Sequence, residues 1–267
     1  MYVSRGTRIA LRIVTGVILA AVYVPLIVVM VNSFNADRTF GWPPSGFTLT
    51  WWSRAAHNAG AVAALRTSVL VGLLATAIAL VLGTLAAMSL QRYRFFGRDA
   101  VSLLVILPIA LPGIVTGIAL NNAFRTVLGV PLSLLTLVIA HATFCIVVVF
   151  NNVIARLRRL GGDLEEASMD LGADSFTTFR RVTFPLLRTA LLAGGLLAFA
   201  LSFDEIIVTR FTASQNTTTL PIWILDNLFR PNQAPIVNVV ATVLVIASII
   251  PIWIAQRLSG NASGGRL

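Results

Sequence analysis

Apolar and polar positions alternate along this chain in long blocks. Six apolar segments are each long enough to cross the hydrocarbon core of a bilayer, which needs about 20 helical residues. They lie near residues 9–31, 65–90, 100–120, 131–155, 187–209 and 236–256. The pattern predicts an all-α polytopic membrane protein with six transmembrane helices, forming a single domain over residues 1–267.

The composition agrees with this pattern and excludes several other classes of protein. Hydrophobic residues make up 57% of the chain and charged residues 11%, whereas soluble domains carry about 25% charged residues. The net charge of +10 comes from arginines at the ends of apolar segments, a pattern typical of membrane topology signals, so nucleic acid is not an expected partner. The single cysteine, Cys145, excludes an intrachain disulfide. No metal-ligand cluster or phosphate-binding glycine loop is evident.

The positions of the arginines predict the orientation of the helices. With the N-terminus inside, the cytoplasmic stretches hold Arg5, Arg8, Arg12, Arg92, Arg94, Arg98, Arg156, Arg158, Arg159, Arg180, Arg181, Arg188, Arg257 and Arg266. The opposite side holds Arg38, Arg54, Arg66, Arg125, Arg210 and Arg230. Because basic residues are more abundant on the cytoplasmic side, both termini and the 156–186 loop are predicted to be cytoplasmic. The first apolar stretch is longer than a signal-peptide core and lacks a clear cleavage site, which indicates a retained helix.

Two further segments are predicted from composition. The outward segment 32–64 contains Trp42, Trp51 and Trp52, and indoles prefer the headgroup layer, so it is expected to lie along the outer membrane surface. A role in substrate binding is the alternative for these tryptophans. The tail, residues 259–267, is rich in Ser and Gly and is predicted to be flexible.

The polar loop 160–185 is the longest polar interval between two apolar segments. A short helix is predicted there, capped by Asp163 and ended by Gly172, with Glu165 and Glu166 in its electropositive first turn. Its small apolar stripe comprises Leu164, Ala167 and Leu171. A second helix is predicted over residues 176–184, with Asp174 or Ser175 as its cap and Pro185 as its end.

The spacing within this loop carries a family resemblance. The signature E-A-A-x3-G-x9-I-x-L-P is matched here by Glu166, Ala167, Ser168, Gly172, Val182, Thr183, Phe184 and Pro185. The loop thereby resembles that of permease subunits of binding-protein-dependent ABC importers. Three residues depart from the signature, Ser for the second Ala, Val for Ile and Phe for Leu, and each retains size or apolarity.

The resemblance implies a type I ABC importer permease fold whose loop docks, as a coupling helix, into a cleft on an ATPase subunit. The residues implied in ATPase coupling are Glu165, Glu166, Ala167, Ser168, Leu171, Gly172, Val182 and Pro185. The implied partners are a homologous second permease, two ATPase subunits, an extracytoplasmic solute-binding protein and the bilayer of the cytoplasmic (inner) membrane. The chain itself is then not an enzyme and holds no cofactor, since ATP and Mg²⁺ are used by the partner ATPase.

Two adjacent carboxylates, Asp204 and Glu205, lie toward the outer end of the fifth apolar segment. Acids at membrane depth are costly and usually face an aqueous cavity or a partner, so the pair is a candidate site for a cationic substrate. If both residues are helical they point about 100° apart, and one of them is expected to face the path. The alternatives are an ion pair with Arg210, a pair with an arginine of a neighbouring subunit, or a position at the outer surface. Nearby aromatic residues that can add cation–π contacts are Phe203, Phe211 and Trp223.

The third apolar segment contains Pro108, Pro112 and Gly113. Proline removes a helical hydrogen bond and glycine permits close approach, so this segment is a candidate gate, with plain packing as the alternative. His141 is a lone histidine among apolar residues and is predicted to be packed and hydrogen-bonded, with a proton relay as the alternative.

The substrate class rests on a second resemblance. Residues 201–209, 219–223 and 230–238 are similar to the second permease of spermidine/putrescine-type importers, which implies a polyamine substrate. Related permeases carry opines, other amines or iron, and these remain alternatives. An ion-coupled secondary transporter is a further alternative, although such proteins usually have more helices and acids nearer the bilayer midplane. A membrane scaffold without transport activity would not need the acidic pair or the patterned loop.

Overall fold

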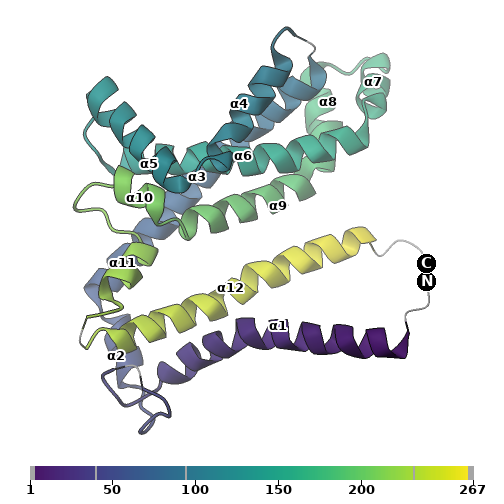
Figure 1. Ribbon diagram of the computed structural model, residues 1–267. Helices are drawn as coiled ribbons and strands as arrows, with labels where there is room; N and C mark the ends of the chain where they lie inside the picture. Colours follow the sequence, from purple (N-terminus) through teal and green to yellow (C-terminus); the bar gives the residue numbers. More distant parts are fainter. Residues whose placement is uncertain (1–3, 40, 94, 231, 264–267) are drawn as a thin grey trace. The chain divides into compact units, whose positions relative to one another are not determined.

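The structure is a computed structural model that describes residues 4–39, 41–93, 95–230 and 232–263, without the side chains of 106 and 250–263. Within these ranges the chain is helical, apart from loops and one isolated bridge between Asn35 and Phe47, which confirms the all-α prediction (Figure 1). The helices are α1 (Arg5–Asn32), α2 (Thr50–Ala56), α3 (Ala59–Arg92), α4 (Arg98–Ala110), α5 (Gly113–Asn122), η1 (Ala123–Val127), α6 (Leu134–Leu160), α7 (Asp163–Asp170), α8 (Ser175–Thr178), η2 (Phe179–Thr183), α9 (Phe184–Phe203), α10 (Ile207–Thr212), α11 (Leu220–Asn227) and α12 (Ala234–Ser263).

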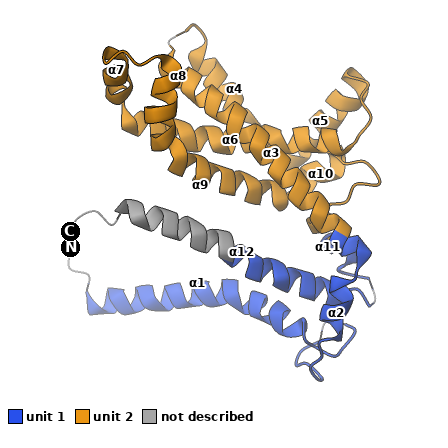
Figure 2. Cartoon of the chain, turned by 180° about the vertical axis from the view of Figure 1, so that it is seen from behind, with its two compact units in different colours: residues 1–62, 224–253 blue, residues 63–223, 254–267 orange. Residues whose placement is uncertain are grey.

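Contacts divide the chain into two compact units, coloured in Figure 2. Unit 1 comprises residues 1–62 and 224–253, and unit 2 comprises residues 63–223 and 254–267. Unit 1 contains α1, α2 and the described part of α12 up to 253, whereas unit 2 contains the helices from α4 to α10 and most of α3. A single permease domain over the whole chain therefore stays a prediction.

Four helical runs among the described residues are long and apolar enough to cross a membrane: Arg5–Asn32, Ala59–Arg92, Leu134–Leu160 and Ser175–Phe203. A fifth helix, α12, is apolar over Ala234–Ile249. The most apolar stretch of α1 has no buried residue, whereas 61% of that of α6 is buried. Helix α6 is thus the centre of unit 2, while α1 presents its apolar side chains outward, as a helix in lipid does.

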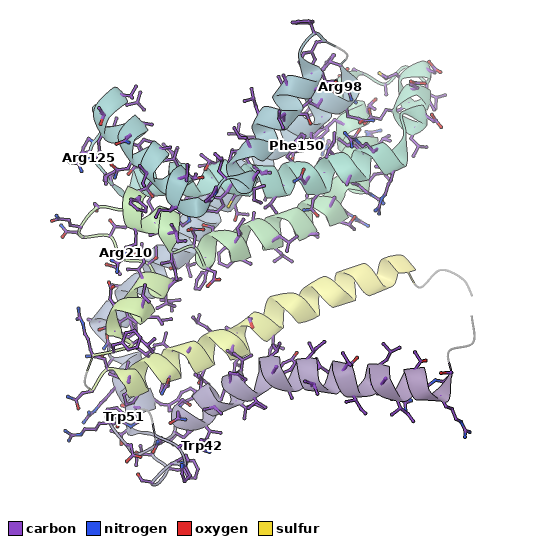
Figure 3. The ribbon with its side chains drawn as sticks, viewed as in Figure 1. Trp42, Trp51, Arg98, Arg125, Phe150 and Arg210 are labelled. Carbon is purple, nitrogen blue, oxygen red and sulfur yellow. The ribbon has the colours of Figure 1, made fainter. Side chains whose placement is uncertain are left out.

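The core of unit 2 forms where α6 packs against its neighbours. Val149 and Val153 of α6, Leu187 and Ala198 of α9 are all fully buried. Helix α3 approaches α6 closely at Gly83, where an added Cβ would lie 2.9 Å from the carbonyl oxygen of Ile146. Glycine at this position lets two backbones pass at a distance that any side chain would prevent. Figure 3 shows the side chains of unit 2, with Phe150 labelled on α6.

The third apolar segment, predicted as one helix over 100–120, is two helices. Helix α4 ends at Ala110 and α5 begins at Gly113. Leu111 between them is extended, with φ −81° and ψ 144°, because the ring of Pro112 disfavours the helical conformation of the preceding residue. Pro108, by contrast, is accommodated inside α4.

The helix expected to end at Pro185 does not end there, so that prediction is wrong. Helix α8, the π-helical turn η2 and α9 form one continuous helical run from Ser175 to Phe203. The amide of Phe184 donates to the carbonyl of Phe179, five residues earlier. The wider turn places Pro185 in the first turn of α9, where a missing N–H costs least.

The fifth apolar segment, predicted to be helical over 187–209, is interrupted near its end. Helix α9 ends at Phe203 and α10 begins at Ile207. The break arises because the side chain of Glu205 accepts a hydrogen bond from the amide of Val208 and so competes with the helical ladder.

The C-terminal tail also differs from its prediction. Helix α12 continues through Ser263 instead of ending at residue 259, because a long helix propagates into following residues at little cost and neither Ser nor Asn blocks it as proline does. The rest of the predicted tail, residues 264–267 with Arg266, lies outside the described residues, as does Arg94.

The segment of unit 1 that contains the three tryptophans is a folded loop. The indole of buried Trp51 donates to the carbonyl of Asn35 at 2.9 Å, and Phe34 stacks on Trp52 with ring centroids 5.1 Å apart. Trp42, labelled with Trp51 in Figure 3, is exposed. The three tryptophans thus differ: Trp51 belongs to the core of the loop and Trp42 remains a candidate for the headgroup layer.

Candidate functional site

Two polar interruptions of unit 2 contain the residues with candidate functions. The first is the knob, defined as residues 162–178, which comprises α7, α8 and the turn between them and lies beyond the end of α6 (Figure 1). The second is the acid turn, residues 204–206, between α9 and α10.

The first turn of the knob differs in one detail from its prediction. Gly162 occupies the N-cap of α7 without a side-chain bond, and Asp163 is the first helical residue, so Asp163 is not the cap. Asp163, Glu165 and Glu166 together place three acids in the first turn, where the positive end of the helix dipole favours negative charge.

Gly172 closes α7 with the hydrogen bonds of a Schellman motif. Its φ is +87°, a conformation that favours glycine, and its amide donates to the carbonyl of Met169 while the amide of Ala173 donates to that of Ser168. The prediction that Gly172 ends this helix is confirmed.

Helix α8 starts at a capping residue and is joined to α7. Asp174 accepts from the amide of Thr177 at 3.0 Å, and hydrogen bonding to Thr177 lowers the pKa of this exposed carboxyl group. The hydroxyls of Ser168 and buried Thr178 lie 3.1 Å apart and share a hydrogen bond. An alanine at position 168 could not form this bond, which gives the departure from the signature a structural role.

The outer face of the knob is apolar and uncovered. Leu171 is 90% exposed, Phe176 70% and Leu164 54%, and Ala167 and Glu166 are also exposed. The stripe predicted on α7 therefore exists and is exposed. A rigid, apolar surface at a predicted water-facing loop is a feature typical of a protein-binding site.

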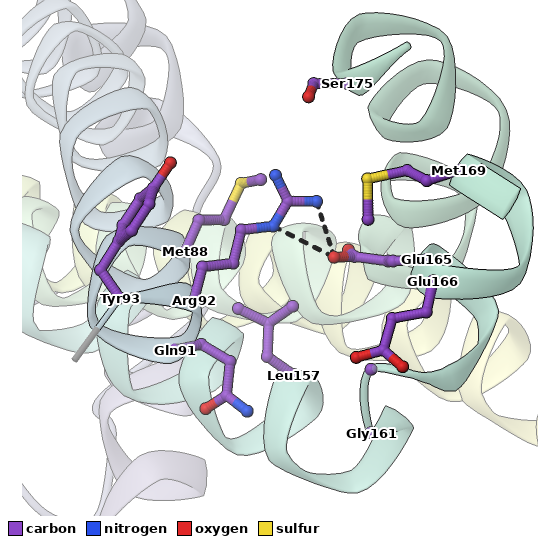
Figure 4. A pocket seen from close by; sticks show the side chains of 11 residues that line it. Met88, Gln91, Arg92, Tyr93, Leu157, Gly161, Glu165, Glu166, Met169 and Ser175 are labelled. Carbon is purple, nitrogen blue, oxygen red and sulfur yellow. Dashed lines mark hydrogen bonds and ion pairs between the residues drawn. The ribbon is translucent and has the colours of Figure 1, made fainter. Parts of the chain in front are cut away.

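Glu165 points the other way, toward the end of α3 (Figure 4). One of its carboxylate oxygens, Oε2, lies 2.6 Å from Nη2 and 3.1 Å from Nε of Arg92, the last residue of α3. The other, Oε1, accepts the hydroxyl proton of Thr183 in η2. Both oxygens of Glu165 are thus bonded within the chain.

A cavity of about 430 Å³ opens beside this ion pair. Its lining residues are Met88, Gln91, Arg92, Tyr93, Leu157, Gly161, Gly162, Glu165, Glu166, Met169 and Ser175 (Figure 4). The ends of α3 and α6 form its walls together with α7. Glu166 borders the cavity, whereas Glu165 is already engaged.

The acid turn contains the two carboxylates predicted to line a path. Asp204 is the C-cap of α9 and is exposed. Glu205 is half-buried, and its Oε1 accepts from the amide of Val208 at 2.8 Å. The expectation of two successive helical residues 100° apart is therefore wrong, because α9 ends at Phe203, before both acids.

Buried His141 of α6 bonds to both sides of the acid turn. Its Nδ1 lies 2.7 Å from the hydroxyl of Ser202 and its Nε2 lies 2.8 Å from that of Thr209. Thr209 gives its single proton to the carbonyl of Glu205, so in a neutral ring Nε2 donates to Thr209 and Nδ1 accepts from Ser202. The prediction of a packed, hydrogen-bonded histidine is confirmed.

Helix α10 is packed tightly against α5, the helix that follows the predicted gate. An added Cβ at Gly117 would lie 2.7 Å from the ring of Phe211, and one at Gly113 would lie 3.6 Å from Ile207. Asn121 donates to the carbonyl of Phe211. Because α5 and α10 are in contact, a movement at the Pro112 break would also displace α10 and the acid turn that precedes it.

The three candidate aromatic residues are not brought together. Phe203 contacts Phe199 of its own helix with ring centroids 5.8 Å apart, Phe211 packs on α5, and Trp223 is buried in α11. No ring contact among the described residues joins them to Asp204. Among the predicted path residues, Asp204 is the one whose carboxylate is exposed.

Sequence reasoning missed the side-chain partners of Glu165 and of His141. Arg92 and Thr183 were absent from the predicted site, although Arg92 belongs to the same predicted cytoplasmic side as the loop. The predicted position of Arg92 and the loop on the same side of the membrane is the signal that could have suggested the Arg92–Glu165 pair. For Ser202 and Thr209 no comparable signal exists, because hydroxyl residues occur throughout membrane helices.

The family described as "Binding-protein-dependent transport system inner membrane component" matches residues 79–261, a range that includes both the knob and the acid turn. The chain belongs to this family. It is therefore a multi-pass inner-membrane permease, a non-catalytic subunit without a cofactor that operates with a binding protein, an ATPase and a paired permease.

Named relatives and solved structures agree. The permease is 34% identical over 248 residues to "Spermidine/putrescine transport system permease protein PotC" of Escherichia coli (strain K12), which covers 93% of each chain. It is 31% identical to "Putrescine transport system permease protein PotI" of the same strain, over 92% of this chain and 89% of that one. A bacterial ABC transporter involved in alginate import shares its fold, with a TM-score of 0.73 over 96% of this chain and 99% of the other, at 16% identity.

Proposed function

We propose that this permease takes up polyamines such as putrescine and spermidine, delivered by an extracytoplasmic binding protein and driven by a separate ATPase. The names of its relatives support the substrate class. Exposed Asp204 supports it chemically, because a di- or tricationic amine needs a carboxylate along its path. Glu205, whose carboxylate accepts from the amide of Val208, positions the turn, and Phe203, Phe211 and Trp223 are proposed to contact the substrate at separate places along the path. Opines, other amines and iron are the competing substrates of related permeases.

Docking of the knob on the ATPase is the proposed means of coupling. The observation that carries this proposal is the exposed apolar face of Leu164, Leu171 and Phe176 on a doubly capped, hydrogen-bonded hairpin. In this arrangement Glu166, Ala167, Leu171 and Gly172 contact the ATPase. Ser168, Val182 and Pro185 shape the support beneath them. Rigidity matters because a flexible loop would absorb the movement of the ATPase instead of transmitting it.

The proposed membrane arrangement has six crossings, with both termini and the knob in the cytoplasm. Helices α4 and α5 together form the third crossing and α12 forms the sixth. Arg98 lies near one end of unit 2, and Arg125 and Arg210 lie toward the other (Figure 3), which supports the sidedness inferred from the arginines. The assembly contains a homologous partner permease, two ATPase subunits and the binding protein. Pro108, Pro112 and Gly113 form the gate, which opens by movement of α5 together with α10.

Gly172→Ala tests the coupling role of the knob. Alanine at positive φ costs about 1–2 kcal/mol, and it distorts the turn that supports Leu171. We expect uptake and binding-protein-stimulated ATPase activity of the assembled complex in proteoliposomes to fall together, and Gly172→Pro to abolish both because it also removes the amide bonded to Met169.

Gly97→Ala is the matched control. Gly97 also has positive φ and has open space around it, but it lies at the start of α4, outside the knob. If both alanine variants impaired uptake equally, or if Gly172→Pro retained stimulated ATPase activity, the coupling role of the knob would be wrong.

A further inference from the structure

We infer that Glu165 is a positioning residue through which movement of the knob enters α3, in contrast to the ATPase contact that the sequence suggested. This inference rests on the proposed coupling function of the knob. It assigns to Arg92, Glu165 and Thr183 a role inside the permease, and it leaves Glu166 as the acid that faces outward.

The orientation of Glu165 is the first step. Its side chain is 20% exposed and that of Arg92 31%, and both carboxylate oxygens bond to residues of this chain. A carboxylate with both oxygens bonded within its own chain has little capacity left for a docking partner. Glu166, one position further along α7, is exposed. Adjacent helical residues point about 100° apart, so the two carboxylates extend in different directions from α7, although both border the cavity beside the ion pair.

The two partners of Glu165 connect the knob to two different helices. Arg92 is the last residue of α3, and Thr183 is the last residue of η2, directly before α9. Arg92 forms both of its bonds with one oxygen, through Nε and Nη2, which restricts the direction of the contact as well as its distance. Displacement of α7 therefore pulls on α3 and on the start of α9 together.

Helix α3 can carry that displacement across the membrane. Its 34 residues form one unbroken helix, about 50 Å long at 1.5 Å per residue. It approaches α6 at Gly83 and α9 at Gly72, where an added Cβ would lie 2.9 Å from Phe199. Near its other end, the hydroxyl of Ser68 accepts from the amide of Leu220 at 2.8 Å. The two polar contacts, at Arg92 and Ser68, thus join the knob to the segment that begins α11.

A purely stabilising role accounts for the ion pair less well. Partly exposed ion pairs contribute little to the stability of a fold, and α7 is already closed by Gly172 and joined to α8 through Ser168. The Arg92–Glu165 contact adds a constraint on the position of α7 relative to the end of α3.

The test measures uptake per ATP hydrolysed by the complete complex in proteoliposomes. Glu165→Gln keeps the side-chain size and Arg92→Gln shortens the side chain, and each removes one charge. We expect each to lower this ratio by about two- to thirtyfold, the range for residues along a coupling route. The double variant Arg92→Glu with Glu165→Arg restores the opposite charges and is expected to recover at least half of the ratio. Asp170→Asn, on the same short helix, is the control and should leave the ratio unchanged.

Two further measurements separate the outcomes. Copurification of the ATPase should be unaffected in Glu165→Gln and reduced in Glu166→Gln. Loss of ATPase binding in Glu165→Gln would show that Glu165 is a docking residue and overturn the inference, while the proposed function would stand. A lower melting temperature with an unchanged ratio would also overturn it, by showing a purely structural role. If the proposed coupling function of the knob were wrong, the result would differ: Gly172→Ala would keep normal uptake and normal stimulated ATPase activity.

Discussion

The knob and the acid turn each contain a pair of adjacent acids, and in each pair one acid is engaged while the other is exposed. Glu165 bonds to Arg92 and Thr183 while Glu166 is exposed. Glu205 bonds to the amide of Val208 while Asp204 is exposed. In both places one acid therefore builds the local structure, and the other is available to something outside the chain.

The two regions differ in how the structural acid is held. In the knob, at the proposed water-facing surface, an arginine neutralises it. At the acid turn the carboxylate of Glu205 accepts from the backbone amide of Val208, and Thr209, which also bonds to His141, donates to the backbone carbonyl of Glu205. Burying a second full charge in a bilayer is costly, whereas a backbone amide can satisfy a carboxylate oxygen at lower cost. The difference predicts that mutations in the His141 network act through stability, that mutation of exposed Asp204 acts through substrate binding, and that mutations at the knob act through coupling.

The largest expected effect is at His141. His141→Leu leaves the hydroxyls of Ser202 and Thr209 without their partner, which should cost about 3 kcal/mol of stability. A thermal melt of the purified permease complex measures this. Thr143→Ala is the control on the same helix, because the hydroxyl of Thr143 donates to the carbonyl of Ala140 within α6 and its loss should cost much less. If both variants lost the same amount of stability, the hydrogen bonds of His141 would contribute no more than an ordinary polar side chain within a helix, and the prediction would be wrong.

A smaller effect is expected when the two carboxylates of the acid turn are neutralised separately. Asp204→Asn should raise the KM for putrescine uptake about thirtyfold, the equivalent of about 2 kcal/mol for a charge-assisted hydrogen bond. Glu205→Gln should change it much less, because a glutamine oxygen can still accept from the amide of Val208. Initial rates of labelled putrescine uptake measure both. The reverse order of effects would place the substrate at Glu205 and would contradict the division of roles within the pair.

The smallest effect is expected at the cap of α8. Asp174→Ala removes the acceptor for the amide of Thr177, while Asp174→Asn retains one, so hydrogen exchange at Thr177 should quicken in the first variant only. Because the pKa of Asp174 is lowered in the folded state, its contribution is present above the unfolded pKa of about 3.9 and is lost as the pH falls through the lower folded value. If exchange at the amide of Thr177 became faster as soon as the pH fell below neutral, the assignment of Asp174 as its ionised cap would be wrong.

Local signals in the sequence predicted much of the knob. The positions of Gly172 and Asp174 follow from backbone conformation and capping, both of which depend on a few neighbouring residues. The same local reasoning failed at Asp163, at Pro185 and within residues 100–120. In the last two cases the effect of a proline was predicted wrongly. Pro185 was expected to end a helix, but a π-helical turn accommodates it. Residues 100–120 were expected to form one helix, but Leu111 before Pro112 is extended.

Contacts between distant residues could not be predicted in this way. Arg92 and Glu165 are 73 residues apart in the chain, and His141 lies 61 residues from Ser202 and 68 from Thr209. Each of these side chains has many possible partners, and only helix packing selects among them. Which acid of the second pair is exposed could not be predicted either, because it depends on where α9 ends and on the bond between Glu205 and the amide of Val208.

By itself the sequence determined that the protein is a helical membrane permease with a patterned polar loop, because hydrophobic block length, arginine placement and the spacing from Glu166 to Pro185 are properties of the chain alone. The tertiary structure alone decided which acid of each pair is engaged. For Glu165 that choice depends on helix packing, which brings Nη2 of Arg92, 73 residues away, to 2.6 Å from its carboxylate. For Glu205 it depends on the end of α9, after which the amide of Val208 lies 2.8 Å from its carboxylate.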